Sequence, residues 1–432
     1  MHLSSKNVKN CKVYIETYGC SANQSESEMI AGILEGNEIK IVDSSELADI
    51  IVVNTCIVKK STETKILYRI KQLELSKKGL VIAGCMPEIR QREILRIAPN
   101  SCIISTHQIK KIVSAIDSLV KGDKAYFIGK NNEENINAPR KRSNPVIAII
   151  EISKGCLGEC TYCSVKGVKG DLHSYSQKSI IQEIQNAVSE GCKEIWLTSQ
   201  DCGCYGKEKN ETIIDLLKNI EKIQGNFRIR IGMMNPEHIP PILDELIQCY
   251  KNERVYKFIH IPVQSGSDSV LGRMSRRYTI EDFKKIITKF RKEIPEINIW
   301  TDLIIGFPEE SNKEFESTIK LIKEIKPNFV NISKFGAMKG TFAAEMKQVD
   351  SKIINERAKI ISELCKNVST EVNKAQIGKT KRLLITEKGK HDTLKGRDES
   401  FRQVVLRSPN AKIGDFIESQ IISASHFGLF TS

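Results

Sequence analysis

Three cysteines, Cys156, Cys160 and Cys163, lie on one short segment with the spacing C-x3-C-x2-C. Thiolates at this spacing on a single loop can all face one metal centre. A four-iron cube takes four ligands, and cysteine thiolates usually supply all of them. Three cysteines leave one iron open, where a small molecule can chelate. The spacing therefore predicts an iron–sulfur site with an open iron.

Two other interpretations of these cysteines stay open. A zinc site with three cysteines and one histidine would take His173 as the nearest further ligand. Buried thiols that bind nothing are a second alternative, because free cysteine packs as a small apolar side chain. The rest of the chain agrees better with iron.

A second set of cysteines stands at the ends of predicted strands in the first part of the chain. Each directly follows a run typical of a buried strand or its turn: Cys20, Cys56 and Cys85. The carboxyl ends of parallel strands meet at one edge of a sheet, where ligands collect. Three thiolates at that edge would suit a second cluster. The alternative is that they are small apolar residues at strand ends.

Strands and helices alternate along residues 11–127. Strands are expected at residues 13–16, 50–53, 80–83 and 102–105. Helix-period segments lie between them, for example at residues 26–34, 64–75 and 109–120. This alternation predicts a parallel sheet with covered faces. Residues 128–145 are polar and predict a linker. Arg140, Lys141 and Arg142 in this linker either contact phosphate or are solvated, and solvation is favoured.

The alternation resumes at Val146 and continues to about Val372. Strands are expected at residues 146–152, 194–199, 228–233, 257–262, 297–304 and 328–334, and helices at residues 177–190, 213–223, 239–250, 280–293, 311–325 and 352–372. Six such units predict a partial β/α barrel, whose chemistry takes place at the carboxyl ends of its strands. Several polar residues are expected at that end: Gln200, Asp201, Asn235, Gln264 and Ser265.

The last part of the chain changes character. Short strands separated by turn residues are expected at residues 380–386, 401–405, 416–423 and 427–430. A stretch of this size predicts a small barrel of the kind that binds oligonucleotides. Phe401 and Phe416 either stack on bases or fill the barrel core, and the core is favoured for any single aromatic.

Composition agrees with a nucleic-acid partner and a cytoplasmic location. The formal net charge is +13 and the pI is near 9.0, and such an excess of basic residues favours a polyanionic partner. No apolar run approaches the roughly 20 residues of a membrane span, and residues 1–10 lack the apolar stretch of a signal peptide. Thirteen cysteines in a cytoplasmic protein are better explained by metal ligation than by disulfides.

Together these stretches resemble the methylthiotransferase family of radical S-adenosylmethionine (SAM) enzymes. The residues that carry the resemblance are Tyr-Gly-Cys20-Ser-Ala-Asn-Gln, Asn-Thr-Cys56, Ala-Gly-Cys85-Met, Gly-Cys156-Leu-Gly-Glu-Cys160-Thr-Tyr-Cys163, His260-Ile-Pro-Val-Gln-Ser-Gly-Ser and Thr-Asp302-Leu-Ile-Ile-Gly-Phe-Pro. Two further stretches, around Gln200 and Asn235, are similar to the archaeal and eukaryotic branch. That branch modifies N6-threonylcarbamoyladenosine in tRNA, next to the anticodon.

The resemblance implies an α/β fold with three domains. Residues 1–127 would form an N-terminal methylthiotransferase domain with an auxiliary 4Fe–4S cluster. Residues 128–145 would be the linker and residues 146–368 the radical SAM barrel. Residues 369–432 resemble the TRAM domain, a small RNA-binding β-barrel.

The resemblance also implies the chemistry. The cofactors would be two 4Fe–4S clusters and SAM, which would serve as radical source and methyl donor, with no side chain acting as acid or base. The loop cysteines would hold the cluster that binds SAM, and the three cysteines of the first domain would hold the cluster that carries the sulfur. The product would be a methylthio group on carbon 2 of N6-threonylcarbamoyladenosine at position 37. The partners would be tRNA and an electron donor like flavodoxin or ferredoxin. SAM contacts are expected from four residues: Tyr162, Gln200, Gln264 and Asp302.

The sequence departs from the family at a few places. Ala337, Met338 and Lys339 stand where the family usually has Pro-Arg-Pro, which puts in doubt a phosphate or carboxylate contact there. Cys202 and Cys204 are interpreted as space-filling. Other functions stay open as alternatives: methylthiolation of isopentenyladenosine in tRNA or of a ribosomal protein aspartate, or an RNA-binding protein with zinc or an iron–sulfur cluster.

Overall fold

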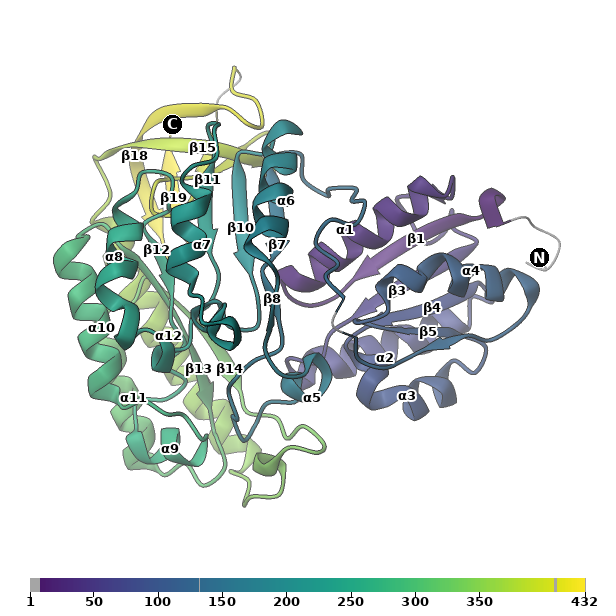
Figure 1. The fold of residues 1–432 in the computed structure, drawn as a ribbon. Coiled ribbons are helices and arrows are strands. Elements are labelled where there is room, and N and C mark those ends of the chain that lie inside the picture. Colours follow the sequence, from purple (N-terminus) through teal and green to yellow (C-terminus); the bar gives the residue numbers. More distant parts are fainter. Residues whose placement is uncertain (1–7, 132, 408–409, 432) are drawn as a thin grey trace. The chain divides into compact units, whose positions relative to one another are not determined.

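The computed structural model describes residues 8–131, 133–407 and 410–431 (Figure 1). Its contacts divide the chain into two compact units. Unit 1 comprises Met1–Ser143, Ile149–Leu157 and Cys163–Glu183, and unit 2 comprises Asn144–Ala148, Gly158–Tyr162 and Ile184–Ser432. Within the described ranges, no helix has the length and apolar character that a membrane span needs.

Unit 1 is built on a parallel sheet of six strands in the order β2-β1-β3-β4-β5-β6. The strands are β1 (Lys12–Thr17), β2 (Lys40–Ile41), β3 (Ile50–Thr55), β4 (Gly79–Gly84), β5 (Cys102–Ser105) and β6 (Tyr126–Phe127). Every residue of β3, β4 and β5 is buried. This burial explains why the strands read as apolar runs in the sequence. The parallel pairing confirms the predicted sheet.

The helices of unit 1 are α1 (Ser21–Gly36), α2 (Lys60–Glu74), α3 (Met86–Ile97), α4 (Ile112–Lys121) and α5 (Val165–Lys169). Strands β8 (Ser153–Lys154) and β9 (His173–Ser174) form a small antiparallel pair. Helix α3 was not predicted from the sequence. It buries only Met86, Pro87 and Ile94 and has non-helical dihedral angles at Arg90, so its apolar periodicity is weak.

Two arginines that were expected to be solvated have buried side chains in unit 1. The Nε atom of Arg140 lies 3.2 Å from Glu183 Oε1, and its Nη1 donates to the Ser25 hydroxyl at 2.8 Å. Arg142 Nη2 also lies 3.2 Å from Glu183 Oε1. The prediction of solvation was wrong for these two residues, because a buried carboxylate that is distant in sequence pairs with both.

Unit 2 contains two three-stranded sheets, in the orders β11-β10-β7 and β12-β13-β14. The strands are β7 (Ile147–Glu151), which begins in this unit, β10 (Glu194–Thr198), β11 (Arg228–Ile231), β12 (Phe258–His260), β13 (Asn298–Ile305) and β14 (Phe329–Lys334). Strand β10 pairs in parallel with β11, and β13 pairs in parallel with β12 and with β14. A parallel bridge from Ile229 to Val255 connects the region of β11 to the chain before β12. This order confirms the predicted partial barrel.

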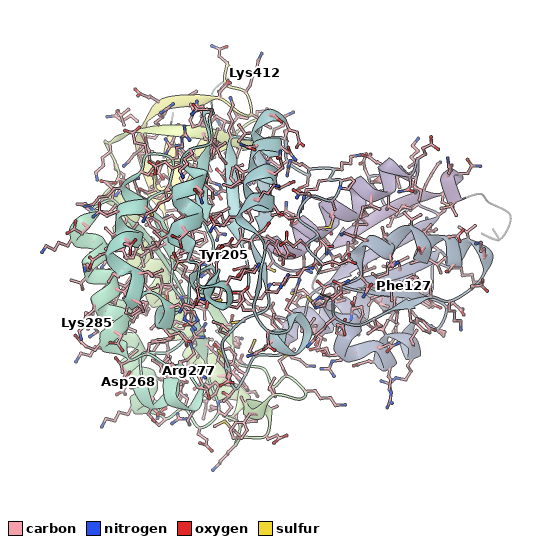
Figure 2. The ribbon with its side chains drawn as sticks, viewed as in Figure 1. Phe127, Tyr205, Asp268, Arg277, Lys285 and Lys412 are labelled. Atoms are coloured by element: carbon pink, nitrogen blue, oxygen red, sulfur yellow. The ribbon has the colours of Figure 1, made fainter. Side chains whose placement is uncertain are left out.

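Helices follow the barrel strands along the chain. They are α6 (Gln177–Ser189), α7 (Ile213–Ile220), α8 (Leu243–Lys251), α9 (Asp268–Arg273), α10 (Ile280–Glu293), α11 (Asn312–Ile325) and α12 (Ser351–Lys374). Helices α7, α10 and α11 each begin with a capping box, in which a Ser or Thr side chain and an acidic side chain satisfy free backbone N–H groups. The short helix α9, which starts at Asp268 (Figure 2), was not predicted.

The C-terminal strands of unit 2 close into a barrel, as predicted. They are β15 (Thr380–Lys388), β16 (Leu394–Arg397), β17 (Gln403–Leu406), β18 (Phe416–Ser425) and β19 (Gly428–Thr431), in the order β15-β16-β17-β19-β18. Its core consists of aliphatic residues: Leu383, Ile385, Val404, Leu406, Ile421 and Leu429. The short strand β16 was not predicted.

Phe401 neither fills this aliphatic core nor can stack on a base. It is buried, at 4% exposure, and packs against Tyr256 and Phe258 of the β/α barrel. The Arg397 guanidinium lies 4.4 Å from its ring centroid. Phe416 is half-buried beneath the Arg382 guanidinium, 4.8 Å from its ring centroid. Both aromatic residues are therefore partners of arginines within the protein.

Candidate functional site

The three N-terminal cysteines lie at the carboxyl ends of three neighbouring strands. Cys20 precedes α1, Cys56 directly follows β3, and Cys85 stands between β4 and α3. Parallel pairing aligns these ends, since Thr17 pairs with Asn54 and Thr55 pairs with Gly84. Cys56 and Cys85 are buried and Cys20 is exposed. The fold thus brings together the three residues that the sequence pattern grouped.

Glycines keep the space beside these thiols open. Gly19 has φ +120°, and a Cβ atom there would lie 2.6 Å from Cys56 Cβ and 2.9 Å from Cys56 Sγ. Gly84 has φ +93°, and a Cβ atom there would overlap the side chain of Asn54. A residue with a side chain is strained in this backbone region and would also fill the space. The glycines directly before Cys20 and Cys85 are therefore part of the site.

Burial dominates the electrostatics of the three thiols. It raises the pKa of the Cys56 thiol to about 11, with a smaller contribution of the same sign from the nearby Cys20. Burial also raises the pKa of Cys85, with smaller contributions of the same sign from Cys56 and Cys20. Three thiolates this close together need a positive partner, because each disfavours the charge of the others. Thiolate-bound iron meets that need, so the set fits three ligands of a four-iron cube.

The loop that carries Cys156, Cys160 and Cys163 follows β7 and β8. Cys156 and Cys163 belong to unit 1 and Cys160 to unit 2, and all three are half-buried. Gly155, directly before Cys156, has φ +74°, and a Cβ atom there would overlap the Asp171 carbonyl oxygen. The loop therefore also begins with a glycine that the backbone requires. Its place after the first barrel strand is where the sequence predicted it.

Arg276 is a site residue that sequence reasoning missed. Its Nη1 lies 3.1 Å from Cys160 Sγ, and its Nη2 donates to Asn235 Oδ1 at 2.8 Å. The guanidinium therefore places a positive charge beside a sulfur that the sequence pattern assigns as a metal ligand. The neighbouring Arg277 is exposed and pairs with Glu159 of the same loop (Figure 2). The signal in the sequence that could have identified it is the pair of adjacent arginines, Arg276 and Arg277, just after α9.

Two of the residues expected to contact SAM, Gln264 and Asp302, lie together. Gln264 has φ 68°, and its backbone N–H donates to the Asp302 carbonyl at 2.8 Å. The Asp302 carboxylate lies 2.8 Å from His260 Nε2 and accepts a hydrogen bond from Asn331 Nδ2 at 2.8 Å. This carboxylate is thus held in place by residues of β12 and β14.

The other two residues expected to contact SAM, Tyr162 and Gln200, lie on separate loops of the barrel. Tyr162 packs edge-on against Phe307, with ring centroids 6.2 Å apart. Gln200 is half-buried just beyond the end of β10. SAM contact by these four residues stays a prediction.

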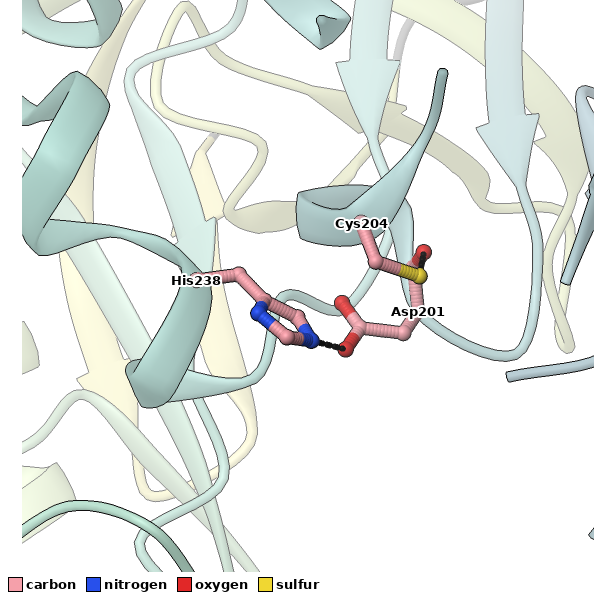
Figure 3. A group of neighbouring side chains, drawn as sticks. All are labelled: Asp201, Cys204 and His238. Carbon is pink, nitrogen blue, oxygen red and sulfur yellow. Dashed lines mark hydrogen bonds and ion pairs between the residues drawn. The ribbon is translucent and has the colours of Figure 1, made fainter. Parts of the chain in front are cut away.

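A buried trio near the ends of β10 and β11 has the residue types of a metal site (Figure 3). The potential ligand atoms of Asp201, Cys204 and His238 lie within 4.8 Å of one another. His238 Nε2 lies 3.5 Å from Asp201 Oδ2, and Lys207 Nζ lies 2.9 Å from His238 Nδ1. Burial lowers the pKa of His238 to about 4, with smaller contributions of the same sign from Lys207 and Arg276. Nearby positive charges oppose a cation, so we interpret the trio as a buried polar cluster, in which Cys204 Sγ lies 3.2 Å from the Asp201 carbonyl oxygen.

The structure also shows the surroundings of the residues at which this chain departs from the family pattern. Cys202 and Cys204 are fully buried, as expected for space-filling residues. Met338 is buried, at 5% exposure, while Lys339 beside it is exposed. The following residues approach the cysteine loop, since the Ala343 N–H donates to the Thr161 carbonyl at 2.9 Å. Met338 therefore cannot replace an arginine contact, and Lys339 is the accessible basic residue of this segment.

Comparison with protein families matches two parts of the chain. Residues 12–105 match an uncharacterised protein family, UPF0004, and residues 150–322 match the radical SAM superfamily. The TsrM radical SAM methyltransferase from Kitasatospora setae has a similar fold, with a TM-score of 0.55 and 12% identity over 77% of this chain and 76% of that chain. OxsB, a cobalamin-dependent radical SAM enzyme, has a TM-score of 0.53 and 12% identity over 82% of this chain and 56% of that chain. At these identities the likeness concerns the fold alone.

Several known proteins align with almost the whole chain. A probable threonylcarbamoyladenosine tRNA methylthiotransferase from Pyrococcus horikoshii is 39% identical over 417 residues, which cover 96% of this chain and 97% of that protein. The corresponding protein of Methanothermobacter thermautotrophicus is 39% identical, covering 92% of this chain and 94% of that protein. The human threonylcarbamoyladenosine tRNA methylthiotransferase is 35% identical, covering 96% of this chain and 73% of that protein. The chain belongs to the threonylcarbamoyladenosine tRNA methylthiotransferase family of radical SAM proteins.

Proposed function

We propose that this protein transfers a methylthio group to carbon 2 of N6-threonylcarbamoyladenosine at position 37 of tRNA. The observation that supports this most is the 39% identity, over 96% of the chain, to an archaeal protein named for that activity. The radical SAM match over residues 150–322 supports the reaction class. SAM would serve as both radical source and methyl donor.

Two sets of cysteines would hold the clusters. Cys156, Cys160 and Cys163 would bind the cluster with the open iron, and Cys20, Cys56 and Cys85 would bind the second. When bound, these groups and SAM supply the radical and the sulfur, which a reaction at an unactivated adenine carbon requires. The protein residues would hold the thiolates in place and exclude water. Arg276 would place its positive charge beside the Cys160 sulfur through the contact described above.

Other side chains would orient SAM and the target base. We expect Tyr162, braced by Phe307, to lie against the adenine of SAM. Gln200, Gln264 and Asp302 offer polar groups to its remaining atoms, and Asp302 is already held in place by His260 and Asn331. The target base must leave its stack to reach these residues, which costs less in an anticodon loop than in a duplex.

We further propose a division of labour along the chain. Residues 1–127 would carry the auxiliary cluster, residues 146–368 would cleave SAM, and residues 369–432 would bind tRNA. The required electrons would come from a donor like flavodoxin or ferredoxin.

The substrate is tested by the identity of the modified nucleoside. Anaerobic protein with reconstituted iron and sulfide, a reductant and SAM should add methylthio to threonylcarbamoyladenosine in tRNA, as detected by mass spectrometry of digested nucleosides. Matched tRNA lacking the threonylcarbamoyl group serves as the control and should stay unmodified. Product on isopentenyladenosine would contradict the proposed substrate but would agree with a methylthiotransferase acting on tRNA. Product on a ribosomal protein alone would reject tRNA as the substrate.

Binding of tRNA should weaken steeply as salt rises, because phosphate neutralisation releases counterions. The C-terminal barrel cannot simply be removed, since Phe401 packs against Tyr256 and Phe258. Surface substitutions avoid that damage. We expect alanine at three exposed barrel lysines to weaken tRNA binding: Lys388, Lys390 and Lys412 (Figure 2).

For each of these lysines that neutralises a phosphate, the slope of log K against log salt should fall by about one. Fluorescence anisotropy with labelled tRNA measures this slope. The control is alanine at three exposed lysines of α10 and α11, which should leave the slope unchanged: Lys285, Lys292 and Lys313. Equal losses from both sets would contradict a binding role for the barrel.

A further inference from the structure

Lys169 is a buried cation that the roles described so far do not use. It ends α5, the short helix after the cysteine loop, and its side chain is 3% exposed. Its ammonium lies 2.8 Å from Glu26 Oε1, 2.7 Å from the Thr106 hydroxyl and 3.8 Å from Glu151 Oε1. Both carboxylates are buried as well. Burying such charges is costly and is weak evidence for stability alone, so a functional role must be considered.

Two short chains of contacts connect Lys169 to the N-terminal cysteines. The Thr106 backbone N–H donates to the carbonyl of Gly84, the residue before Cys85, at 2.9 Å. On the other side, Asn23 Nδ2 lies 3.5 Å from Glu26 Oε2, and Asn23 Oδ1 accepts from the Cys20 N–H at 3.4 Å. Lys169 and Glu26 are thus fixed beside the edge of the sheet that carries the three thiols.

The two charges act on the same thiol with opposite signs. Burial is the main cause of the raised pKa of Cys85; the Lys169 ammonium lowers that pKa and the Glu26 carboxylate raises it. Both effects are expected from charges of opposite sign in a site with little water to screen them. Any charge that changes at the position of the three thiols therefore interacts with this pair.

A cube held by three thiolates is negatively charged, and an added electron makes it more so. The reduction potential of such a cluster depends on its net charge, its hydrogen bonds and its exposure. A buried cation nearby stabilises the reduced form more than the oxidised form, and a buried anion does the opposite. A fixed Lys169–Glu26 pair is suited to setting that potential.

We propose that Lys169 is a positioning residue that makes the cluster on Cys20, Cys56 and Cys85 easier to reduce, with Glu26 opposing it. This inference rests on the second cluster of the proposed function. In the step concerned, one electron passes from a one-electron donor of the ferredoxin type, which is oxidised, to the cluster, which is reduced. No bond or proton is exchanged.

The test uses full-length protein in which Cys156→Ala, Cys160→Ala and Cys163→Ala leave only the second cluster. Its midpoint potential is measured by redox titration with dithionite, followed by electron paramagnetic resonance. Lys169→Met should lower the potential, and Glu26→Gln should raise it. Each shift should correspond to at least about a tenfold change in the ratio of reduced to oxidised cluster, which is about 59 mV for one electron.

Two further variants separate charge from structure. Lys169→Arg keeps the charge and should stay near the parent potential. Glu183→Gln removes another buried carboxylate of unit 1, which pairs with Arg140 and Arg142 instead, and should leave the potential unchanged. Lys169→Met leaves Glu26 unpaired and can fail to fold. In that case the midpoint potential of Glu26→Gln is compared with that of Glu183→Gln, and a rise in Glu26→Gln alone still supports an effect of the Lys169–Glu26 pair. General damage to the site would not shift the potential in opposite directions.

The outcomes separate this inference from the proposed function. Failure of the parent variant to bind close to four iron atoms per chain would overturn the second cluster and this inference with it. A normal cluster whose potential does not move, or moves in the same direction in Lys169→Met and Glu26→Gln, would overturn the role of Lys169 alone.

Discussion

Replacing Cys20, Cys56 and Cys85 by alanine should abolish methylthiolated product and leave cleavage of SAM to 5′-deoxyadenosine intact. Their thiols lie at the carboxyl ends of β1, β3 and β4, and no residue of the cysteine loop after β8 is altered. The two sets of cysteines have separate roles in the proposed function. Chromatography of 5′-deoxyadenosine and mass spectrometry of tRNA nucleosides measure the two activities in one reaction.

Matched controls come from cysteines at the opposite edge of the same sheet. Cys11 precedes β1 and Cys102 begins β5, so both lie at amino ends of parallel strands, and both are fully buried. Alanine at these positions removes the same number of atoms per site but should retain product. Full product from the Cys20, Cys56 and Cys85 variant would reject the sulfur role of this site.

Replacing Cys156, Cys160 and Cys163 by alanine should eliminate SAM cleavage and product together. Reconstituted wild-type protein should hold about eight iron and eight sulfide, the content of two four-iron cubes, and the variant about half of that. The loss is large because the radical has no source without the cluster that binds SAM. Iron and sulfide analysis after anaerobic reconstitution gives the content, and 5′-deoxyadenosine gives the activity.

The control for this variant changes three cysteines of unit 2 that lie outside the loop. Cys192, Cys249 and Cys365 are buried or half-buried, and alanine in their place should keep the full iron content. Zinc as the stoichiometric metal of the wild-type protein would contradict the radical SAM assignment. Unchanged iron content in the loop variant would contradict the assignment of these ligands.

Much of the fold follows from local pattern. The predicted strand at residues 102–105 and helix at residues 280–293 have the observed bounds of β5 and α10. Buried parallel strands are continuous apolar runs, and the start of α10 is marked by the capping pair Thr279 and Asp282. Such signals depend only on residues close in sequence, so they are visible without the tertiary structure.

Elements with few buried residues could not be predicted in this way. Helix α3 buries only three side chains, and β2 is a two-residue strand at the sheet edge. Their conformation depends on neighbours that the tertiary fold supplies, and their own periodicity is too weak to predict it.

Some residues of the candidate site could likewise be identified from local sequence, and others only from the tertiary structure. The six cysteines were identified from spacing and from their position after predicted strands, both of which are local features. The contacts of Lys169 with Glu26, of Arg276 with Cys160 and of Phe401 with Tyr256 join residues more than a hundred positions apart in the chain. Spacing and periodicity determine which residues share a loop, a face or a strand end. Only packing decides which charge is buried beside which thiol, because that depends on how distant segments meet.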